Sequence, residues 1–293
     1  MAVIRPPRRT PPIFARPSLQ STPMNTNAGE VDTRELGSAA ENAAKTTKGK
    51  GSTKAPKSDK GKKGGNYASN RRRLIVDAAS GDVNFADVSI LLPFATDGAD
   101  ASSNGHEPTT VGTPLFVTGK YTGALDTNGG NNYYTYPDAA SLGLGAEEFT
   151  MEAWVYFPTV VNGSLFGKGN TSVTKEVTIL HAGGVGFAFR YSINGTSHTD
   201  IYSNIAPSNA TWHHVAFCRD VDTLRSYVDG VAGSTGDLTG KTIFDGAGDF
   251  WTGGTGSYTA GDHWLEDVRV TKGVCRYPDG TSFDPPAANF PTS

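Results

Sequence analysis

Hydrophobic and polar residues alternate strictly over nine positions of this chain, from Phe149 to Phe157. The odd-numbered positions hold Phe, Met, Ala, Val and Phe, and the even-numbered positions hold Thr, Glu, Trp and Tyr. Successive side chains of a β-strand point to opposite faces, so this stretch is predicted to be a strand whose odd face lies in a core. The even face carries Trp154 and Tyr156, which indicates that it either binds a ligand or is covered by another segment.

Short apolar or alternating runs continue to the C-terminus and are separated by Gly, Asn, Asp and Pro. Hairpin turns are indicated at 193–195 and 220–223, and no internal repeat is present. These features predict an all-β fold, a two-sheet antiparallel jelly-roll sandwich formed by residues 87–293. The predicted strands are Val88–Phe94, Leu115–Val117, Tyr133–Tyr136, Thr150–Phe157, Ser164–Gly167, Lys175–His181, Phe187–Ser192, Asp200–Ser203, Trp212–Arg219, Leu224–Val228, Thr242–Phe244, Asp249–Trp251 and Trp264–Thr271.

Residues 1–86 have a different pattern and are predicted to form an extended basic arm with a flexible linker. Proline recurs through residues 1–23, which excludes a helix there and favours extended, polyproline-like backbone. One short helix is expected over residues 32–45, where acidic residues have the spacing of a capping box. Residues 45–65 are rich in Lys, Gly, Ser and Thr, a composition typical of a linker.

Charge divides the chain in the same way. Residues 1–80 contain 16 Lys+Arg and 6 Asp+Glu, a balance of +10. The remaining residues contain 10 Lys+Arg and 23 Asp+Glu, a balance of −13, so the two parts are expected to face different partners. Nucleic acid is not the expected partner, because the basic segment lacks interleaved aromatic residues except Tyr67 and carries no helix-turn-helix, zinc-finger or RNA-binding motif.

The arm also carries apolar residues that a solvated tail does not need, and these suggest a peptide that lies in a groove of another protein. The alternative is a disordered tail with incidental apolar residues. The predicted anchoring residues are Ile4, Ile13, Phe14, Leu19, Arg71, Arg72 and Arg73.

Two cysteines, Cys218 and Cys275, are too few for a disulfide framework, and two unpaired thiols on strands are favoured over a bond between them. The sequence has no apolar run of the length of a signal peptide or a membrane span, so no membrane association is expected.

Four segments follow one another in a characteristic order: GLGAEEFTMEAWVYF at 143–157, TWHHVAFCR at 211–219, SYVDGV at 226–231 and WLEDVRVTKGVCRY at 264–277. Together they resemble the concanavalin A-like lectin/glucanase superfamily, and in particular its laminin-G-like jelly rolls. The closing stretch, which contains FDPPAANFP, is similar to modules of bacteriophage virion proteins. The resemblance covers about residues 87–293. Since the superfamily contains lectins, glycan hydrolases and purely structural modules, the resemblance leaves the function open.

Glucanases of this superfamily carry two glutamates and an aspartate that alternate along one strand, which places two carboxyl groups about 5 Å apart for a retaining mechanism. This chain has no such triad, because Glu147, Glu148 and Glu152 have other spacings. Glu266 and Asp267 are adjacent and are expected to point to opposite faces of a strand. No catalytic residue is therefore predicted, and glycoside hydrolysis remains a minor alternative.

The resemblance makes calcium the ion to consider, because laminin-G-like modules often bind one. Asp97, Asp100 and Asn104 offer oxygen ligands within one loop, and Asp267 would complete the set if the fold brings it near. The alternative is a turn rich in Asx residues that binds no metal. No cofactor is expected to be required.

Saccharide rings stack on aromatic side chains, so aromatic residues on the even face or beside polar loops are candidate glycan-binding residues. Trp212 and Trp264 begin predicted strands and are instead expected to close the ends of the sandwich. The candidates are Trp154, Tyr156, Trp251 and Tyr258.

The combined features predict a structural protein of a bacteriophage virion, located on the virion surface in multiple copies on a symmetric particle. The arm is expected to bind the major capsid or tail protein, and the jelly roll is expected to display a lectin-like surface toward host polysaccharide. Capsid decoration is favoured over a tail fibre or tail adhesin, because no fibrous shaft is present. A free carbohydrate-binding lectin with a disordered tail is the alternative.

Overall fold

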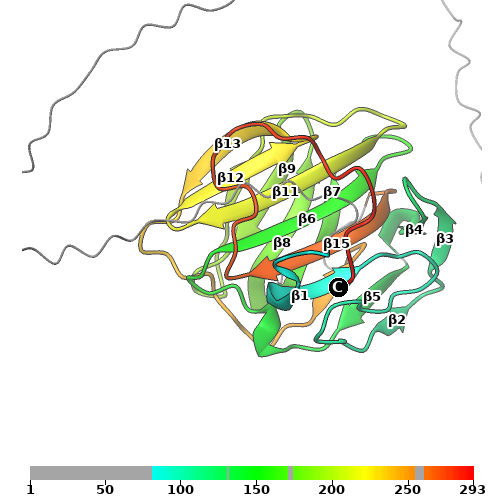
Figure 1. Ribbon diagram of the computed structural model, residues 1–293, viewed down its shortest axis with the longest axis horizontal. Helices are drawn as coiled ribbons and strands as arrows, with labels where there is room; N and C mark the ends of the chain where they lie inside the picture. The colour runs from blue at the N-terminus through cyan, green and yellow to red at the C-terminus, as the bar shows by residue number, and fades with distance from the viewer. Residues whose placement is uncertain (1–80, 131, 171–173, 255–260) are drawn as a thin grey trace, which may run out of the picture. The chain divides into compact units, whose positions relative to one another are not determined.

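The computed structural model describes residues 81–293 except 131, 171–173 and 255–260, and these residues form the two-sheet antiparallel sandwich that the sequence predicts (Figure 1). The predicted arm up to residue 80 and the predicted helix over residues 32–45 lie outside the described residues. No helix among the described residues has both the length and the apolar character needed to cross a membrane.

The described strands are β1 (Val88–Leu92), β2 (Thr109–Val111), β3 (Leu115–Thr118), β4 (Gly123–Asp126), β5 (Tyr133–Tyr136), β6 (Phe149–Tyr156), β7 (Gly163–Asn170), β8 (Thr174–Ala182), β9 (Gly186–Tyr191), β10 (Thr199–Tyr202), β11 (Trp212–Asp220), β12 (Thr223–Val228), β13 (Val231–Asp237), β14 (Phe250–Thr252) and β15 (Trp264–Lys272). Three short 3₁₀ turns complete the regular structure: η1 (Phe85–Asp87), η2 (Asn128–Gly130) and η3 (Ala140–Leu142).

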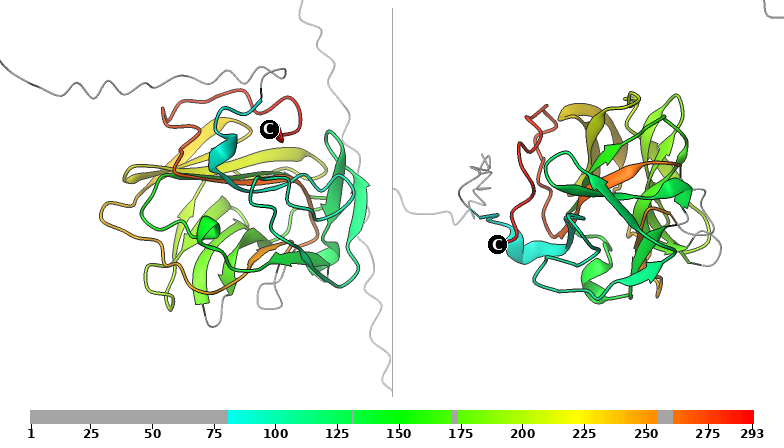
Figure 2. Two further views of the ribbon diagram at one scale, coloured as in Figure 1. Left: turned by 60° about the horizontal axis from the view of Figure 1, so that its bottom comes forward. Right: turned by 90° about the vertical axis from the view of Figure 1, so that its right-hand side faces the viewer.

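Sheet A has the strand order β13-β12-β11-β6-β15-β4-β3, and β1 also pairs with β15. Sheet B has the order β10-β9-β8-β7-β14-β5-β2. Sheet A lies in front and sheet B behind in Figure 1, and Figure 2 shows the two layers from the side. Strand β6 is central in sheet A because it is paired along its length with β11 on one side and with β15 on the other.

The core lies between the sheets and includes the whole odd face of β6 and its extension to residue 157. Phe149, Met151, Ala153, Val155 and Phe157 are each at most 1% exposed. Phe149 stacks on a phenylalanine of β9 in the opposite sheet, at 5.5 Å between ring centroids. Period-two alternation therefore identified the buried face of this strand correctly.

Three observed strands were not predicted, and one predicted strand, 242–244, has no regular structure. Strand β13 has the sequence VAGSTGD, which lacks the alternation of a half-buried strand. Glycine is needed at position 233 for close packing, because a Cβ atom there would lie 2.4 Å from the backbone oxygen of Ser203. Strands β2 and β4 have only 3 and 4 residues, too few to show a period.

The C-terminal segment, residues 273–293, leaves β15 and crosses the outer face of sheet A, on the side away from sheet B (Figures 1 and 2, red). Backbone hydrogen bonds hold it at both ends: Gly273 donates to Glu148 at 2.6 Å, and Asp82 donates to the carbonyl of Ser293 at 2.9 Å. Asp82 is buried within this layer, so the packing of the described residues extends at least to residue 82.

Candidate functional site

Three aromatic rings form a row across the outer face of sheet A, one from each of its central strands. Tyr156 of β6 lies directly opposite Trp212 of β11 and directly opposite Trp264 of β15. Tyr156 stacks on Trp264 with 4.4 Å between ring centroids and an interplanar angle of 16°, and its ring is 5.5 Å from that of Trp212. All three side chains are only partly buried. We call these three residues the aromatic row.

Strand parity explains why the three rings share one face. Val215 and Phe217 of β11 lie in the core, so the even residues of β11, including Trp212, point outward. Leu265 of β15 likewise lies in the core and leaves Trp264 on the outside. The prediction that both tryptophans close the ends of the sandwich was therefore wrong, and the parity of their own strands would have shown it.

One end of the aromatic row is acidic. Asp126 of β4 lies directly opposite Trp264 in the sheet, and Asp262 precedes Trp264 by two positions. Partial burial and the charge of Asp126 together raise the pKa of Asp262 above its ordinary value. The potential at this end of the row is therefore negative when both carboxyl groups are ionised.

Trp154 lies two residues before Tyr156 on the same face of β6. It was also predicted to bind glycan, but it is only 4% exposed. Its ring makes an edge contact with Tyr121 at 5.8 Å and packs on His214 at 5.2 Å. The ammonium of Lys120 lies 4.2 Å from the ring centroid and covers it from the solvent side. Trp154 is thus a packing residue, and a saccharide has no access to its faces in this structure.

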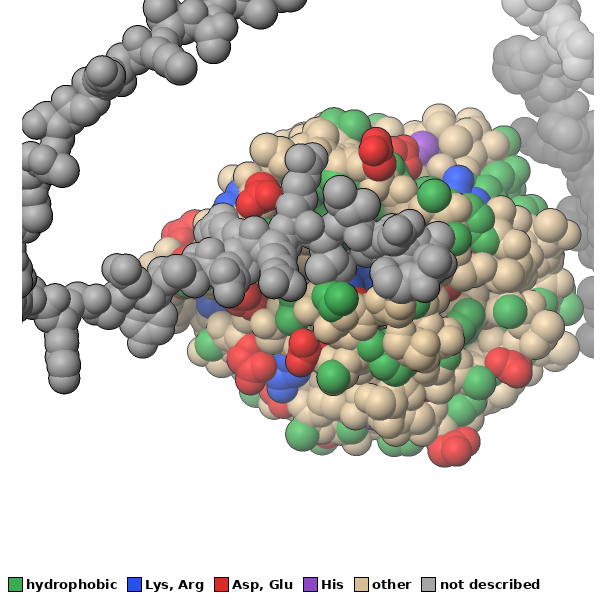
Figure 3. Space-filling view, viewed as in Figure 1, with side chains coloured by type: hydrophobic (Ala, Val, Ile, Leu, Met, Phe, Trp, Pro, Cys, Tyr) green, Lys and Arg blue, Asp and Glu red, His purple; other side chains and the backbone are tan. Residues whose placement is uncertain are grey.

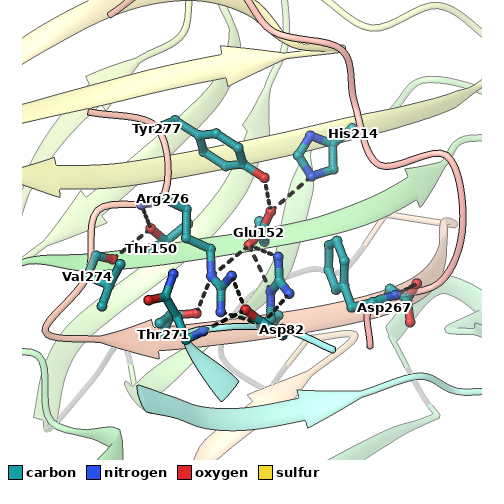
Figure 4. A network of polar contacts seen from close by, with 12 residues as sticks. Asp82, Thr150, Glu152, His214, Asp267, Thr271, Val274, Arg276 and Tyr277 are labelled. Carbon is teal, nitrogen blue, oxygen red and sulfur yellow. Dashed lines mark hydrogen bonds and ion pairs between the residues drawn. The ribbon is translucent and has the colours of Figure 1, made fainter. Parts of the chain in front are cut away.

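Two residues before Trp154, on the same face of β6, Glu152 is fully buried at the centre of a polar network (Figure 4). Its Oε1 accepts hydrogen bonds from Nε and Nη2 of Arg269 at 2.9 and 2.8 Å. Its Oε2 accepts from the hydroxyl of Tyr277 at 2.7 Å and contacts Nε2 of His214 at 3.2 Å. Burial alone would raise the pKa of Glu152, but Arg269 and His214 outweigh burial and hold this pKa below its ordinary value.

A second carboxylate extends the network to the start of the domain. Asp82 accepts from Nη1 and Nη2 of Arg276 at 3.0 and 2.7 Å and from Nη1 of Arg269 at 3.1 Å. Burial raises the pKa of Asp82, yet the hydrogen bonds and charge of Arg276 bring it below its ordinary value. Two arginines thus balance two carboxylates, and the network joins β6, β15, the C-terminal segment and residue 82. Its charges are mutually satisfied, so it holds the C-terminal segment in place.

Glu266 and Asp267 do not point to opposite faces as predicted. The side-chain amide of Asn289 donates to Oε1 of Glu266 at 3.2 Å and to Oδ2 of Asp267 at 3.0 Å, so both carboxyl groups lie under the C-terminal segment. The reason is a β-bulge in β15, where Asp267 has a φ of +53° and the register with β6 shifts. Burial raises the pKa of Asp267 to about 7.

The four residues of the predicted calcium site serve other purposes in the structure. Asp100 accepts hydrogen bonds from the backbone amides of Leu91, Ser102 and His106 at 2.8–3.0 Å. Asn104 donates to two carbonyls of β1, and Asp267 binds Asn289 and the amide of Phe290. Asp97 accepts from the amide of Ala99 in an exposed turn. Within the described residues, no group of three or more His, Cys, Asp or Glu has the arrangement of a metal site.

Of the remaining glycan-binding candidates, Trp251 is 1% exposed, and its indole nitrogen donates to the carbonyl of Gly169 at 2.7 Å. The prediction that Trp251 presents a stacking face was wrong, because its side chain is buried against Gly167 of β7, where the absence of a side chain leaves room for the indole ring. Tyr258 lies outside the described residues. Tyr156 is therefore the predicted candidate that the structure leaves partly exposed, and it lies between two tryptophans that the prediction had assigned elsewhere.

Solved structures with the same fold include several binding domains. The binding domain of Paraclostridial Mosquitocidal Protein 1 matches with a TM-score of 0.56 at 12% identity, over 66% of this chain and 50% of that one. The binding domain of botulinum neurotoxin serotype G matches with a TM-score of 0.52 at 12% identity, over 64% and 49%. This chain thus spans about half the length of these toxin domains.

A third match is domain 4 of AbnA, an extracellular arabinanase from Geobacillus stearothermophilus, solved in complex with arabinotriose. Its TM-score is 0.55 at 18% identity, over 66% of this chain and 96% of that domain. At such identities the likeness shows a shared fold, which is a lectin-like jelly roll. A search of curated proteins found no match.

The sequence also matches the family model described as the concanavalin A-like lectin/glucanases superfamily over residues 128–274. The matched region begins before β5 and ends after β15, so it contains the three strands that carry the aromatic row. It spans half of the chain. The chain belongs to the concanavalin A-like lectin/glucanase superfamily, and the matched residues lie in a laminin-G-like jelly roll.

Proposed function

We propose that the jelly-roll domain binds a saccharide chain on the aromatic row. The observation that carries this proposal is the partial exposure of Tyr156, Trp212 and Trp264 in one row across three paired strands. Tyr156 packs between the two tryptophans, so the ring faces of Trp212 and Trp264 that it does not cover are the ones that can stack on the C–H faces of sugar residues, while the paired strands hold them in place. The arabinotriose bound to a structurally similar domain supports this choice of ligand class.

The charge around the aromatic row favours a neutral saccharide over an anionic one. Asp126 and Asp262 lie at the Trp264 end of the row, and the described domain belongs to the acidic part of the chain, with a balance of −13. Figure 3 shows acidic side chains at several separate places around the face that contains sheet A. A uronic or sialic acid residue beside Asp126 would meet a like charge, which lowers its affinity.

The test is isothermal titration of the full chain with arabinotriose and with a panel of neutral and carboxylated oligosaccharides. We expect binding of at least one neutral oligosaccharide, and a loss of affinity of at least tenfold in Trp264→Ala and in Trp212→Ala. Tyr202→Ala is the matched control, since Tyr202 is a partly exposed aromatic residue of sheet B and its loss should leave the affinity unchanged. A panel that gives no binding would overturn the proposal, as would equal affinities of the row variants and the wild type.

We further propose that residues 1–86 anchor this domain to a virion, most simply as capsid decoration, with a tail adhesin as the alternative position. The support is compositional: residues 1–80 have a balance of +10 and carry spaced apolar residues, whereas the remaining residues have a balance of −13. A basic, proline-rich segment of this kind suits an acidic groove on a major capsid or tail protein, and many copies would follow from the symmetry of the particle.

Deletion of residues 1–65 tests the anchoring role. We expect gradient-purified particles from the native source to contain the full chain and to lose the shortened chain, which should remain folded by circular dichroism. Retention of the shortened chain on particles would contradict anchoring. Absence of the full chain from all particles would favour a free lectin.

A further inference from the structure

The two cysteines meet between β11 and the C-terminal segment. Cys218 lies on the outer face of β11, Cys275 lies just beyond β15, and both are buried beside Ala216 and Tyr227 in a small second core. Their sulfur atoms are 2.6 Å apart, which is closer than two unbonded sulfur atoms approach. The structure contains them as free thiols.

Hydrogen bonds on both sides of Cys275 place it over Cys218. Thr150 of β6 is the direct partner of Cys218 in the sheet. The hydroxyl of Thr150 donates to the carbonyl of Val274 at 2.9 Å and accepts from the amide of Arg276 at 2.9 Å. The residue between Val274 and Arg276 is therefore held at the level of Cys218. The thiol of Cys218 also lies 3.5 Å from the carbonyl of Tyr277, to which it donates.

Other contacts keep the same stretch from moving away. The hydroxyl of Tyr227 donates to the carbonyl of Tyr277 at 2.7 Å, and the side chain of Arg276 is fixed by Asp82. Closure of a disulfide thus requires little backbone movement, because the two sulfur atoms already lie within bonding reach of each other.

We propose that Cys218 and Cys275 form a disulfide bond that ties the C-terminal segment to β11 when the chain meets a small-molecule disulfide oxidant such as oxidised glutathione. The thiolate of one cysteine attacks the oxidant, forms a mixed disulfide and releases one reduced glutathione. The thiolate of the other cysteine then attacks the mixed disulfide and releases the second. Both cysteine thiols lose their protons, which the two departing glutathione thiolates accept, and the two sulfur atoms give up two electrons in total.

Burial controls when this reaction can occur. Burial raises the pKa of the Cys218 thiol well above its ordinary value, and the thiolate is the reactive form. Oxidation is therefore expected to be fast during folding and slow in the chain that has already folded with free thiols. Once formed, the bond closes a loop over a separation of 57 residues and secures the segment that covers the Glu152 network.

The experiment refolds the full chain in oxidised glutathione, then denatures it with a maleimide present and no reductant. We expect an intact mass without maleimide on either cysteine and a tryptic fragment that joins the peptides of Cys218 and Cys275. Reduction of the bond should lower Tm by about 5–15 °C. Two maleimides per chain, glutathione on both cysteines, or a dimer linked between chains would each overturn the proposal.

Cys218→Ala is the matched variant, because alanine preserves the small apolar contact. Its Tm should not respond to oxidised glutathione, and after denaturation Cys275 should carry either one maleimide or one glutathione, because no second thiol is present to displace glutathione. A Tm response of this variant equal to that of the wild type would also contradict the proposal. The mass measurement does not depend on the Tm, so it still decides the question if the variant folds poorly.

Discussion

Two neighbouring parts of one sheet face, built from the same three strands, have opposite properties. At the level of Glu152, the outer face of sheet A is charged and fully buried beneath the C-terminal segment. At the level of Tyr156, it is aromatic and partly exposed. The usual relation between polarity and burial is thus reversed along a single strand.

The difference shows which residues maintain the fold and which are available for binding. A buried carboxylate is stable only when it is paired and hydrogen-bonded, and Glu152 has Arg269, Tyr277 and His214 for this purpose. Within the described part of the chain, the ring contacts of Tyr156 are with the other two members of the aromatic row. We therefore assign fold maintenance to the Glu152 level and ligand binding to the aromatic row.

The largest effect is expected at the centre of the network. Glu152→Ala leaves the buried guanidinium of Arg269 without its main partner and should lower the free energy of unfolding by about 3–5 kcal/mol, measured by urea denaturation. The control is Glu147→Ala, since Glu147 is exposed and makes one long ion pair of 3.9 Å. Its loss should cost at most about 0.5 kcal/mol. Equal losses in the two variants would show that the network contributes little.

Two aromatic residues on the same strand face separate packing from binding. Trp154→Ala should lower the free energy of unfolding by about 3 kcal/mol, because the ring is buried against Tyr121 and His214. Tyr156→Ala should lower it by about 1 kcal/mol and should remove saccharide binding. The assignment of packing to Trp154 and binding to Tyr156 would be wrong if Tyr156→Ala unfolded the domain while Trp154→Ala left its stability unchanged.

The pH dependence of stability should report on Asp267. Its pKa is about 7 in the folded chain because of burial, and it is near 4 when unfolded, so the folded chain holds the proton more tightly. The stability from this group is therefore fully present below about pH 4 and is lost as the pH rises through 7. Urea denaturation at pH 5 and pH 8 should show Asp267→Asn gaining about 2 kcal/mol relative to the wild type at the higher pH. An unchanged difference between the two proteins would contradict this expectation.

The smallest effect is expected at Trp154, which lies between Glu152 and Tyr156 on β6. Lys120→Gln removes the cation over Trp154 and should cost about 0.5–1 kcal/mol, measured by thermal denaturation. Lys241→Gln serves as control, since Lys241 makes a local contact with the carbonyl of Asp237. If both variants have the same Tm as the wild type, the ammonium of Lys120 does not stabilise the packing around Trp154.

Much of the fold could be predicted from the sequence. The strands β6, β11 and β12 lie within about one residue of their predicted bounds, because their alternation is long enough to define a period. The Gly-rich strand β13 could not be predicted, because its sequence does not alternate, and the short strand β4 pairs in part with β15, which is distant in the chain. Parity could also have placed Trp212 and Trp264 on the outside, but their alignment with Tyr156 requires the register of three strands.

What the sequence determined by itself is the alternation of β6: its odd face is core, and its even face carries Glu152, Trp154 and Tyr156. Only the tertiary structure decided that the C-terminal segment covers Glu152, that Lys120 and Tyr121 cover Trp154, and that Tyr156 stays partly exposed. The physical reason is the distance along the chain. Alternation is a local property of the backbone, whereas Glu152 meets Arg269 across 117 residues and Asp82 meets Arg276 across 194 residues.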